Sequence, residues 1–356
     1  TILPTIHVSF APTRTALPGS PLAVSPSHLT HSDRSPVPHQ GVTMTAPGRQ
    51  GSALVIGEAL VDVVIHPGQE PVDIPGGSPA NVALGLARLG RDAELHCWIG
   101  TDERGKAVRA HLEASGVRLA AGADGAERTS TAQATIGEDR AATYLFDLDW
   151  NPPRPNLTDG DSPLLVHTGS IAAILAPGAA TVEQVLRETR ATSTIAYDPN
   201  ARPQLMGEPE DARRIVERLV ALSDLVKCSD EDIAWLYGED ADLESVLRSW
   251  LEAGAAVVVV TRGKEGALAL SASGVRLEVP ADPSVVVADT VGAGDSFMGG
   301  LEDALWSEDL VGADRREALR AVDAETLERI VRHAAAIADI TVSRAGANPP
   351  TRDELP

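Results

Sequence analysis

Asp289-Thr-Val-Gly-Ala-Gly-Asp-Ser-Phe297 leads from a glycine-rich turn into a helix, because apolar residues then recur with helical spacing as far as Leu305. Gly292 and Gly294 allow the backbone to turn tightly and to approach a ligand closely. The first N–H groups of a helix have no partner within the helix and lie at the positive end of its dipole. The stretch therefore predicts an anion site at the start of this helix.

Asp295 is a carboxylate at the mouth of that predicted anion site. A carboxylate in this place can take a proton from an attacking hydroxyl while the turn holds a phosphoryl group. The plainer interpretation is a common glycine-rich turn, in which Asp295 is simply an acid in the first turn of a helix. The nine residues by themselves leave both interpretations open.

The composition limits the classes of partner. The 356 residues, 43% of them hydrophobic, have room for one large α/β domain with or without a small appendage. The net charge of −21 argues against nucleic acid or an anionic membrane, since both need a basic surface. No apolar run reaches the roughly 18 residues of a membrane span. Two cysteines give no disulfide framework, so we expect a cytoplasmic protein.

Residues 1–50 differ from the rest of the chain, being rich in Pro, Ser, Thr and His without hydrophobic periodicity. This composition predicts an irregular or disordered extension that lacks the continuous apolar core of a secretory signal. Met44 is a candidate start of translation, which leaves open whether residues 1–43 belong to the native protein. The folded domain is expected over residues 51–356.

Strand and helix patterns alternate along this domain, which predicts right-handed βαβ units and a mostly parallel sheet with helices on both faces. The predicted strands are at about 52–57, 93–98, 164–168, 194–198, 224–228 and 256–260, followed by a hairpin at 266–279. The predicted helices are at about 79–89, 103–115, 177–190, 209–222, 229–238, 242–253, 294–306 and 323–341.

Two segments at about 61–75 and 130–148 break this rhythm, because both alternate like strands with no helix between them. We expect them to form a small β-rich lid over the carboxyl edge of the sheet, where open α/β sheets bind ligands. Exposed strand edges tend to be covered, so a homodimer through the lid strands is also expected.

Two motifs near the start of the domain place polar groups at that edge. Asp62 follows the first strand and could accept hydrogen bonds from sugar hydroxyls, although a turn aspartate is the better explanation of this residue taken alone. Gly76 and Gly77 let the backbone approach a ligand. Asn81 falls in the next helical turn, where its amide can donate to and accept from a polyol. A helix start without a ligand is the alternative for this second motif.

Two motifs in the second half follow buried strands. Thr261–Gly266 could cradle a nucleotide, but it is no Walker loop, because neither Ser nor Thr follows its Gly-Lys pair; a bare hairpin turn is the alternative. Lys227–Asp232 opens a helix, with Ser229 as a good N-cap and acids that suit the helix dipole. A role for Asp232 in organising Mg²⁺ through water stays open.

Three further features are open or negative. Arg202, after a predicted strand end, could contact a phosphate or form a structural ion pair. His167 precedes a Thr-Gly-Ser turn, and we expect it to be a hydrogen-bonded structural residue. A nicotinamide-dependent oxidoreductase would need Gly-x-Gly-x-x-Gly after the first strand, and Gly57-Glu-Ala59 does not supply it.

The motifs at Gly76–Asn81, Thr261–Gly263 and Asp289–Asp295, in this order and spacing, resemble the ribokinase-like (PfkB) carbohydrate kinases. The resemblance runs from about Ser52 to Glu354. It implies the ribokinase-like α/β fold, a central mostly parallel sheet flanked by helices, with a small β-rich lid. It also implies transfer of the γ-phosphoryl group of ATP, with Mg²⁺, to a sugar hydroxyl.

The resemblance assigns roles position by position. It implies Asp295 as general base, with an anion hole made by Gly292, Ala293 and Gly294. It implies sugar contacts, besides Asp295, from Asp62, Gly76, Gly77 and Asn81. It implies nucleotide contacts from Lys227, Ser229, Thr261, Gly263, Gly266 and Gly294. It implies a loop for a monovalent cation such as K⁺ at Asp289, Val291, Thr341 and Gly346. Pro350 departs from this loop, as Ser229 and Asp232 depart from the family's usual Asn and Glu.

Within the family, residues 76–90 look most like the fructokinases, with the sequence Gly-Gly-Ser-Pro-Ala-Asn-Val-Ala-Leu-Gly-Leu-Ala-Arg-Leu-Gly. Ribokinases tend to have a lysine at the position of Ser78. We therefore expect phosphorylation of D-fructose to fructose 6-phosphate. Another sugar, ketodeoxygluconate or a nucleoside remains an alternative substrate, because one methylene or hydroxyl shifts discrimination by only about 1–3 kcal/mol in an apolar pocket. A non-catalytic sugar- or nucleotide-sensing protein on the same fold is the alternative of another class.

Overall fold

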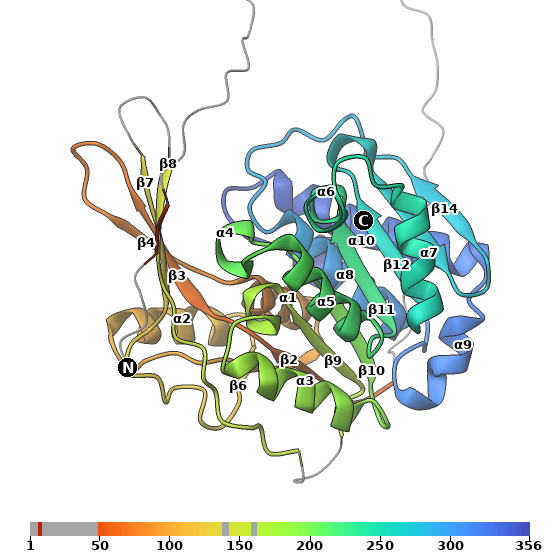
Figure 1. Ribbon diagram of the computed structural model, residues 1–356, viewed down its shortest axis with the longest axis horizontal. Coiled ribbons are helices and arrows are strands. Elements are labelled where there is room, and N and C mark those ends of the chain that lie inside the picture. Colours follow the sequence, from red (N-terminus) through yellow and green to blue (C-terminus); the bar gives the residue numbers. More distant parts are fainter. Residues whose placement is uncertain (1–5, 9–48, 137–141, 158–161) are drawn as a thin grey trace, which may run out of the picture.

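A nine-stranded sheet runs through the centre of the computed structural model, which describes residues 6–8, 49–136, 142–157 and 162–356 (Figure 1). Its strands, in spatial order, are β14 (Arg276–Val279), β13 (Ala267–Ser271), β12 (Val257–Thr261), β11 (Leu225–Ser229), β10 (Thr194–Asp198), β9 (Leu165–Gly169), β2 (Ser52–Ile56), β5 (Asp92–His96) and β6 (Arg118–Leu119). All pairs from β12 to β6 are parallel, and β13 and β14 add an antiparallel edge.

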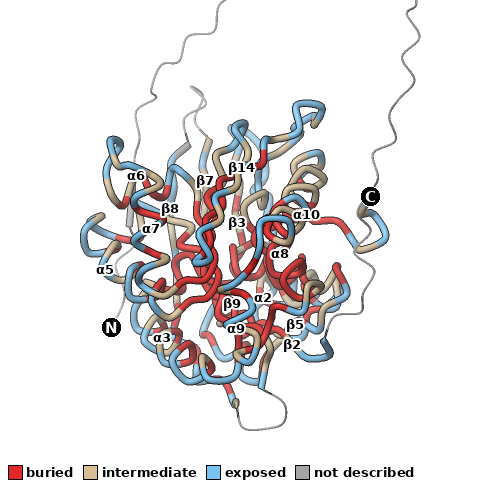
Figure 2. The backbone as a smooth tube through the Cα atoms, turned by 90° about the vertical axis from the view of Figure 1, so that its right-hand side faces the viewer, coloured by how far each residue is buried: buried red, intermediate tan, exposed pale blue. Residues whose placement is uncertain are grey.

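The central strands are buried on both faces because their sequences are continuous apolar runs. In β12, Val257 and Val259 join the core on one face of the sheet, while Val258 and Val260 join the core on the other. Successive side chains of a strand point to opposite faces, so four valines in a row fit a strand between two helical layers. Figure 2 shows the buried residues concentrated in the sheet and in the helix sides that face it.

Two helical layers cover the sheet. One face carries α1 (Ser78–Arg88), α2 (Glu103–Glu113), α8 (Ala293–Ser307), α9 (Arg316–Arg320) and α10 (Ala324–Val342). The other carries α3 (Gly178–Thr189), α4 (Pro203–Met206), α5 (Pro209–Val220), α6 (Asp230–Tyr237) and α7 (Leu243–Ala253). In Figure 1, α3 and α5 lie in front of the sheet and α8 and α10 behind it. Short 3₁₀ turns are η1 (Ser170–Ala173), η2 (Gly263–Glu265), η3 (Ala313–Arg315) and η4 (Arg352–Glu354).

A second, smaller sheet stands to one side of this body (Figure 1). Its order is β1 (Ile6–Val8), β8 (Ala142–Asp147), β7 (Thr131–Ile136), β3 (Leu60–Ile65) and β4 (Val72–Gly76). β3 and β7 are parallel and the other pairs antiparallel. The two segments predicted as a lid supply β3, β4, β7 and β8.

The predicted irregular extension at residues 1–50 lies mostly outside the described residues. Within it, Ile6–Val8 differs from the prediction, because it forms β1 against β8. An Ile-His-Val triplet has the alternation of an edge strand, and β8 offers an edge on which it can pair.

The order of the strands reverses between β2 and β9, since the chain continues from β2 to β5 on one side and from β9 to β10 on the other. Ligands of open α/β sheets bind at such a point, beyond the carboxyl ends of the strands. α8 packs against α1 and α10. The starts of α1 and α8 and the ends of β9, β10 and β11 therefore frame the candidate site.

The predicted elements agree with the structure to within a few residues at their ends. The helix predicted at 79–89 spans Ser78–Arg88, and the helix predicted at 323–341 spans Ala324–Val342. The prediction missed the two-residue strand β6 and the short helices α4 and α9. Among the described residues, no helix combines the length and the apolar character of a membrane span.

Candidate active site

The turn before α8 depends on glycine at two positions. Gly292 has a left-handed backbone with φ 74°, and a Cβ there would lie 2.6 Å from the Cβ of Ala347. A Cβ on Gly294 would lie 2.9 Å from Nζ of Lys227, so this ammonium group sits directly beside the first turn of the helix. Ala293 N–H donates to the carbonyl of Thr290 at 3.2 Å. The helix start thus combines a tight turn, the positive end of the helix dipole and a nearby cation, which suits an anion.

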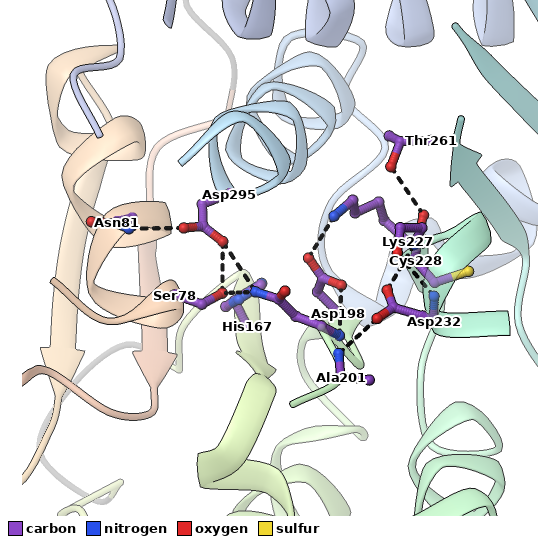
Figure 3. Close-up of polar contacts among 12 residues, drawn as sticks. Ser78, Asn81, His167, Asp198, Ala201, Lys227, Cys228, Asp232, Thr261 and Asp295 are labelled. Carbon is purple, nitrogen blue, oxygen red and sulfur yellow. Dashed lines mark hydrogen bonds and ion pairs between the residues drawn. The ribbon is translucent and has the colours of Figure 1, made fainter. Parts of the chain in front are cut away.

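Asp295, in the first turn of α8, is buried and held by three side chains (Figure 3). Ser78 Oγ donates to its Oδ1 at 2.7 Å, and Asn81 Nδ2 donates to its Oδ2 at 2.8 Å. Asn200 Nδ2 donates to Ser78 Oγ at 2.7 Å and lies 3.3 Å from Oδ1 of Asp295. The structure therefore brings the predicted Asn81 and Asp295 together, from helices 214 positions apart in sequence.

Asn200 and Ser78 were not predicted as contacts of Asp295. Asn200 has a left-handed φ of 39°, which asparagine tolerates better than most residues. Asp198 Oδ1 accepts the backbone N–H of Asn200 at 3.1 Å, and Arg202 Nη1 donates to Oδ1 of Asn200 at 2.7 Å. The Asp-Pro-Asn sequence after a strand was the available signal. Its meaning depended on knowing that β10 ends near α1 and α8.

Asp62, Gly76 at the end of β4 and Gly77 just before α1 lie on the lid side of the site. A Cβ on Gly76 would lie 2.4 Å from Oδ2 of Asp62, so the carboxylate rests against the glycine backbone. Gly77 has φ 110°, and a Cβ there would lie 2.5 Å from the carbonyl oxygen of Glu58. Burial raises the pKa of Asp62, Arg202 opposes this change, and the charge of Asp295 adds to it. Asp62 therefore shares an electrostatic environment with Asp295.

Lys227 and Asp198 form a buried ion pair beneath the turn, with Nζ 2.9 Å from Oδ2. Burial raises the pKa of Asp198 to about 6, although Lys227 acts in the opposite direction. Burial lowers the pKa of Lys227, but the charges of Asp198 and Asp232 outweigh it and leave the pKa raised. The ammonium group beside Gly294 is accordingly charged at neutral pH.

Ser229 and Asp232 form a capping box at the start of α6. Ser229 Oγ accepts the N–H of Asp232 at 3.0 Å, and Asp232 Oδ2 accepts the N–H of Ser229 at 2.8 Å. The other oxygen of Asp232 accepts the N–H of Ala201 at 2.7 Å. Both carboxylate oxygens are thus engaged with backbone, so Asp232 holds the ends of β10 and β11 together.

Thr261, Gly263 and Gly266 follow β12, next to Ser229, with which Thr261 pairs in register. Thr261 Oγ1 donates to the carbonyl of Cys228 at 3.4 Å. Gly266 has φ 87°, and a Cβ there would lie 2.0 Å from the carbonyl oxygen of Val279, so the turn into β13 requires glycine. The predicted nucleotide contacts therefore gather at the ends of β11 and β12.

Asp289 joins two loops near α8. Its Oδ1 accepts the N–H of Val291 at 3.0 Å and its Oδ2 accepts the N–H of Gly346 at 2.8 Å. These backbone hydrogen bonds lower the pKa of Asp289. Thr341 is buried near the end of α10, where its hydroxyl donates to the carbonyl of Ile337. The predicted cation loop is thus brought together, while among the described residues no group of three His, Cys, Asp or Glu could hold a metal ion.

A family model described as pfkB family carbohydrate kinase matches residues 51–354. The chain belongs to this family. A fructokinase from Klebsiella pneumoniae is 34% identical over 264 residues, covering 70% of this chain and 83% of its own length. A fructokinase from Rhizobium leguminosarum bv. trifolii is 33% identical over 268 residues, covering 72% of this chain and 81% of its own length. The family resemblance predicted from the motifs is confirmed.

Solved structures agree with this pfkB family assignment. A double mutant of fructokinase from Vibrio cholerae, in fructose, ADP and potassium ion bound form, has a TM-score of 0.69 and 27% identity, covering 84% of this chain and 95% of that one. Fructokinase from Xylella fastidiosa with bound ATP has a TM-score of 0.68 and 25% identity, covering 83% of this chain and 93% of that one. The predicted ribokinase-like α/β fold is confirmed, and this chain is a carbohydrate kinase.

Proposed function

We propose that this pfkB family kinase transfers the γ-phosphoryl group of ATP to the 6-hydroxyl of D-fructose. The observation that carries the proposal is the Asp295 carboxylate, held by Ser78 and Asn81 in the first turn of α8, where an anion site and a charged lysine meet. The names of the relatives and the fructose and ADP of the Vibrio structure support fructose as the substrate.

Phosphoryl transfer depends on positioning and on stabilising charge in the transition state. As the sugar oxygen bonds to the γ-phosphorus, its proton passes to Asp295 and the bond to the ADP oxygen breaks. The N–H groups of the turn at Gly292, Ala293 and Gly294 hold the transferring phosphoryl oxygens, with Lys227 adding positive charge beside them. Asp295 thus removes the proton while the helix start holds the anion.

The sugar is held on the lid side of this turn. We assign its contacts to Asp62 and Asn81, with the backbone at Gly76 and Gly77 allowing close approach. Asp62 accepts hydrogen bonds from sugar hydroxyls. The charge of Asp295 raises the pKa of Asp62, which supports a ligand shared by the two carboxylates. The nucleotide is held at the opposite side, with contacts assigned to Lys227, Ser229, Thr261, Gly263, Gly266 and Gly294.

Cation use is part of the same proposal. Mg²⁺ bound to the ATP phosphates supplies charge neutralisation. Asp232 would contact this Mg²⁺ through water, since each of its oxygens already accepts a backbone N–H group. The carbonyls near Val291, Thr341 and Gly346 would hold a monovalent cation such as K⁺, with Asp289 joining the two loops.

The cytoplasm is the proposed location of the enzyme. Cys97 and Cys228 are both free and buried, which suits a reducing compartment.

Sugar-dependent release of ADP tests the proposed function. The protein is incubated with ATP, Mg²⁺ and a panel of hexoses, pentoses, ketodeoxygluconate and nucleosides, and NMR locates the phosphate on the product. We expect the highest kcat/KM with D-fructose and a phosphate on its 6-hydroxyl. A higher kcat/KM for another member of the panel would replace fructose as substrate. Sugar binding without ADP release from any member would establish the non-catalytic sensor instead.

We further propose a homodimer through the lid strands. β4 is the end strand of the small sheet, and Val72 and Ile74 on it are 50% and 45% exposed. We expect sedimentation at twice the mass of the chain, and the mass of a monomer for the double variant Val72→Asp/Ile74→Asp. Val286→Asp, an exposed valine outside the lid, is the control that should leave the dimer intact. A monomeric native protein contradicts this proposal.

A further inference from the structure

His167 and Glu302 form a buried pair that the proposed chemistry does not use. Both side chains are 0% exposed, and Nδ1 of His167 lies 2.6 Å from Oε1 of Glu302. Neither Nε2 of His167 nor Oε2 of Glu302 has a hydrogen-bond partner among the described residues. Burying such a pair costs desolvation that apolar residues of similar size would avoid, so stability alone gives no reason for it.

The pair links the catalytic helix to the strand at the reversal point of the sheet. Glu302 lies seven residues after Asp295 on α8, which is close to two helical turns, so both side chains leave the same side of the helix. His167 is in the middle of β9, opposite Ala196 of β10 and Val55 of β2. Figure 3 draws His167 among the residues of the Asp295 network.

The charges of three carboxylates raise the pKa of His167. Burial lowers the pKa of this imidazole, but the charge and hydrogen bond of Glu302 raise it, with further contributions from Asp198 of β10 and Asp295 of α8, and the net change is upward. The charge of Asp295 therefore acts on the imidazole, although the direct contact of His167 is with Glu302. A change at His167 or Glu302 alters both the tie between β9 and α8 and the charge near Asp295.

Glycines make the backbone at the catalytic end of α8 intrinsically flexible. Its N-cap, Gly292, has no side chain to cap the helix, and Gly294, Gly299 and Gly300 add backbone freedom in the first half of the helix. The same first turn carries both the base and the anion hole. Ser78, Asn81 and Asn200 hold the Asp295 side chain itself. The His167–Glu302 pair adds a contact to β9 two turns further along the same side of α8.

Resting on the proposed function, we propose that His167, through Glu302, is a positioning residue that fixes the first turn of α8 against β9 and so holds Asp295 in place for phosphoryl transfer. It touches neither the sugar nor ATP in this role. A purely structural pair would affect stability alone, whereas a positioning pair sets kcat even when stability is restored.

Paired leucine substitutions separate the two roles. His167→Leu and Glu302→Leu each leave one buried polar partner uncompensated, so both should lower the urea midpoint. The double variant His167→Leu/Glu302→Leu should recover that midpoint, yet keep kcat at least tenfold below the native value, with KM for ATP within twofold. A kcat within twofold of native in the double variant overturns the proposal. If the double variant does not fold, Glu302→Gln takes its place. A kcat at least threefold below the native value then supports the proposal, and an unchanged kcat overturns it.

Asp303→Asn is the matched control, because Asp303 is the neighbouring residue on α8 and is equally buried, but pairs with Arg91, Arg352 and His333. It should lower stability and leave the kcat of the folded enzyme within twofold.

Amide hydrogen exchange tests the same idea without turnover. We expect faster exchange at residues 294–298 in the double variant than in the native protein. Unchanged exchange overturns the positioning role, whether or not any sugar supports turnover. A lack of turnover with every sugar would overturn the proposed function separately.

Discussion

Asp295→Asn is expected to lower kcat by about 10²–10⁴-fold, the range that general-base catalysis contributes. Asparagine has the same shape as aspartate and can still accept a hydrogen bond from Ser78 or Asn81, but it cannot take a proton from the sugar hydroxyl. The amide should therefore preserve the turn of α8 while removing the acceptor of the proton. KM for fructose and the affinity for ATP should change far less than kcat.

The measurements are steady-state ADP release, calorimetric binding of ATP, and the midpoint of unfolding for each variant. Glu325→Gln is a matched control, because Glu325 is also an acid in the first turn of a helix but is exposed on α10. It should keep kcat within twofold of native. If Asp295→Asn retained more than a tenth of native kcat with normal folding, Asp295 would not be the general base.

The fold could be predicted from the sequence because its signals are local. Four successive β-branched valines in β12 favour a strand buried on both faces, and the diglycine with proline before α1 marks a helix start. The predicted boundaries were close for the same reason. β6 and α4 were missed because elements of two to four residues are too short to show a period.

The contacts of the site depend on spatial order, which the sequence does not contain. Asn200 reaches Ser78 and Asp295 only because β10 ends beside the starts of α1 and α8. His167 was expected to be a hydrogen-bonded structural residue, but its partner Glu302 is 135 positions away and no local pattern points to it. Ser229 was predicted as an N-cap, and the capping box is present. The local part of the site was predictable, and the contacts between distant segments were not.

Loss of Asp303 should strongly reduce stability. Its side chain is 0% exposed and lies 2.7 Å from Arg91 Nε and 2.7 Å from His333 Nε2, and it also pairs with Arg352. Arg352 further donates to the carbonyl of Leu89 at 2.7 Å. The carboxylate therefore ties α8, the end of α1, α10 and the C-terminal turn together.

Asp303→Ala should lower the free energy of unfolding by about 3–5 kcal/mol at pH 7, because it leaves partly buried cations without their counter-charge. Urea unfolding of native and variant proteins measures the difference. Glu328→Ala is a control, since Glu328 also pairs with an arginine, Arg332, but at the surface, where an ion pair contributes only about 0–1 kcal/mol. A difference for Asp303→Ala below 1 kcal/mol would contradict the proposed tie.

The same difference should depend on pH in a defined direction. Burial raises the pKa of Asp303, but the hydrogen bond of His333 and the charges of Arg91 and Arg352 outweigh it and lower the pKa to about 2, against 3.8 for an unperturbed aspartate. A lowered folded-state pKa gives stability that is present above 3.8 and is lost as the pH falls toward 2. The free-energy difference between native protein and Asp303→Ala should thus be constant from pH 7 to pH 5 and shrink below about pH 4. A difference that stayed constant down to pH 3 would show that the Asp303 charge is not what stabilises the fold.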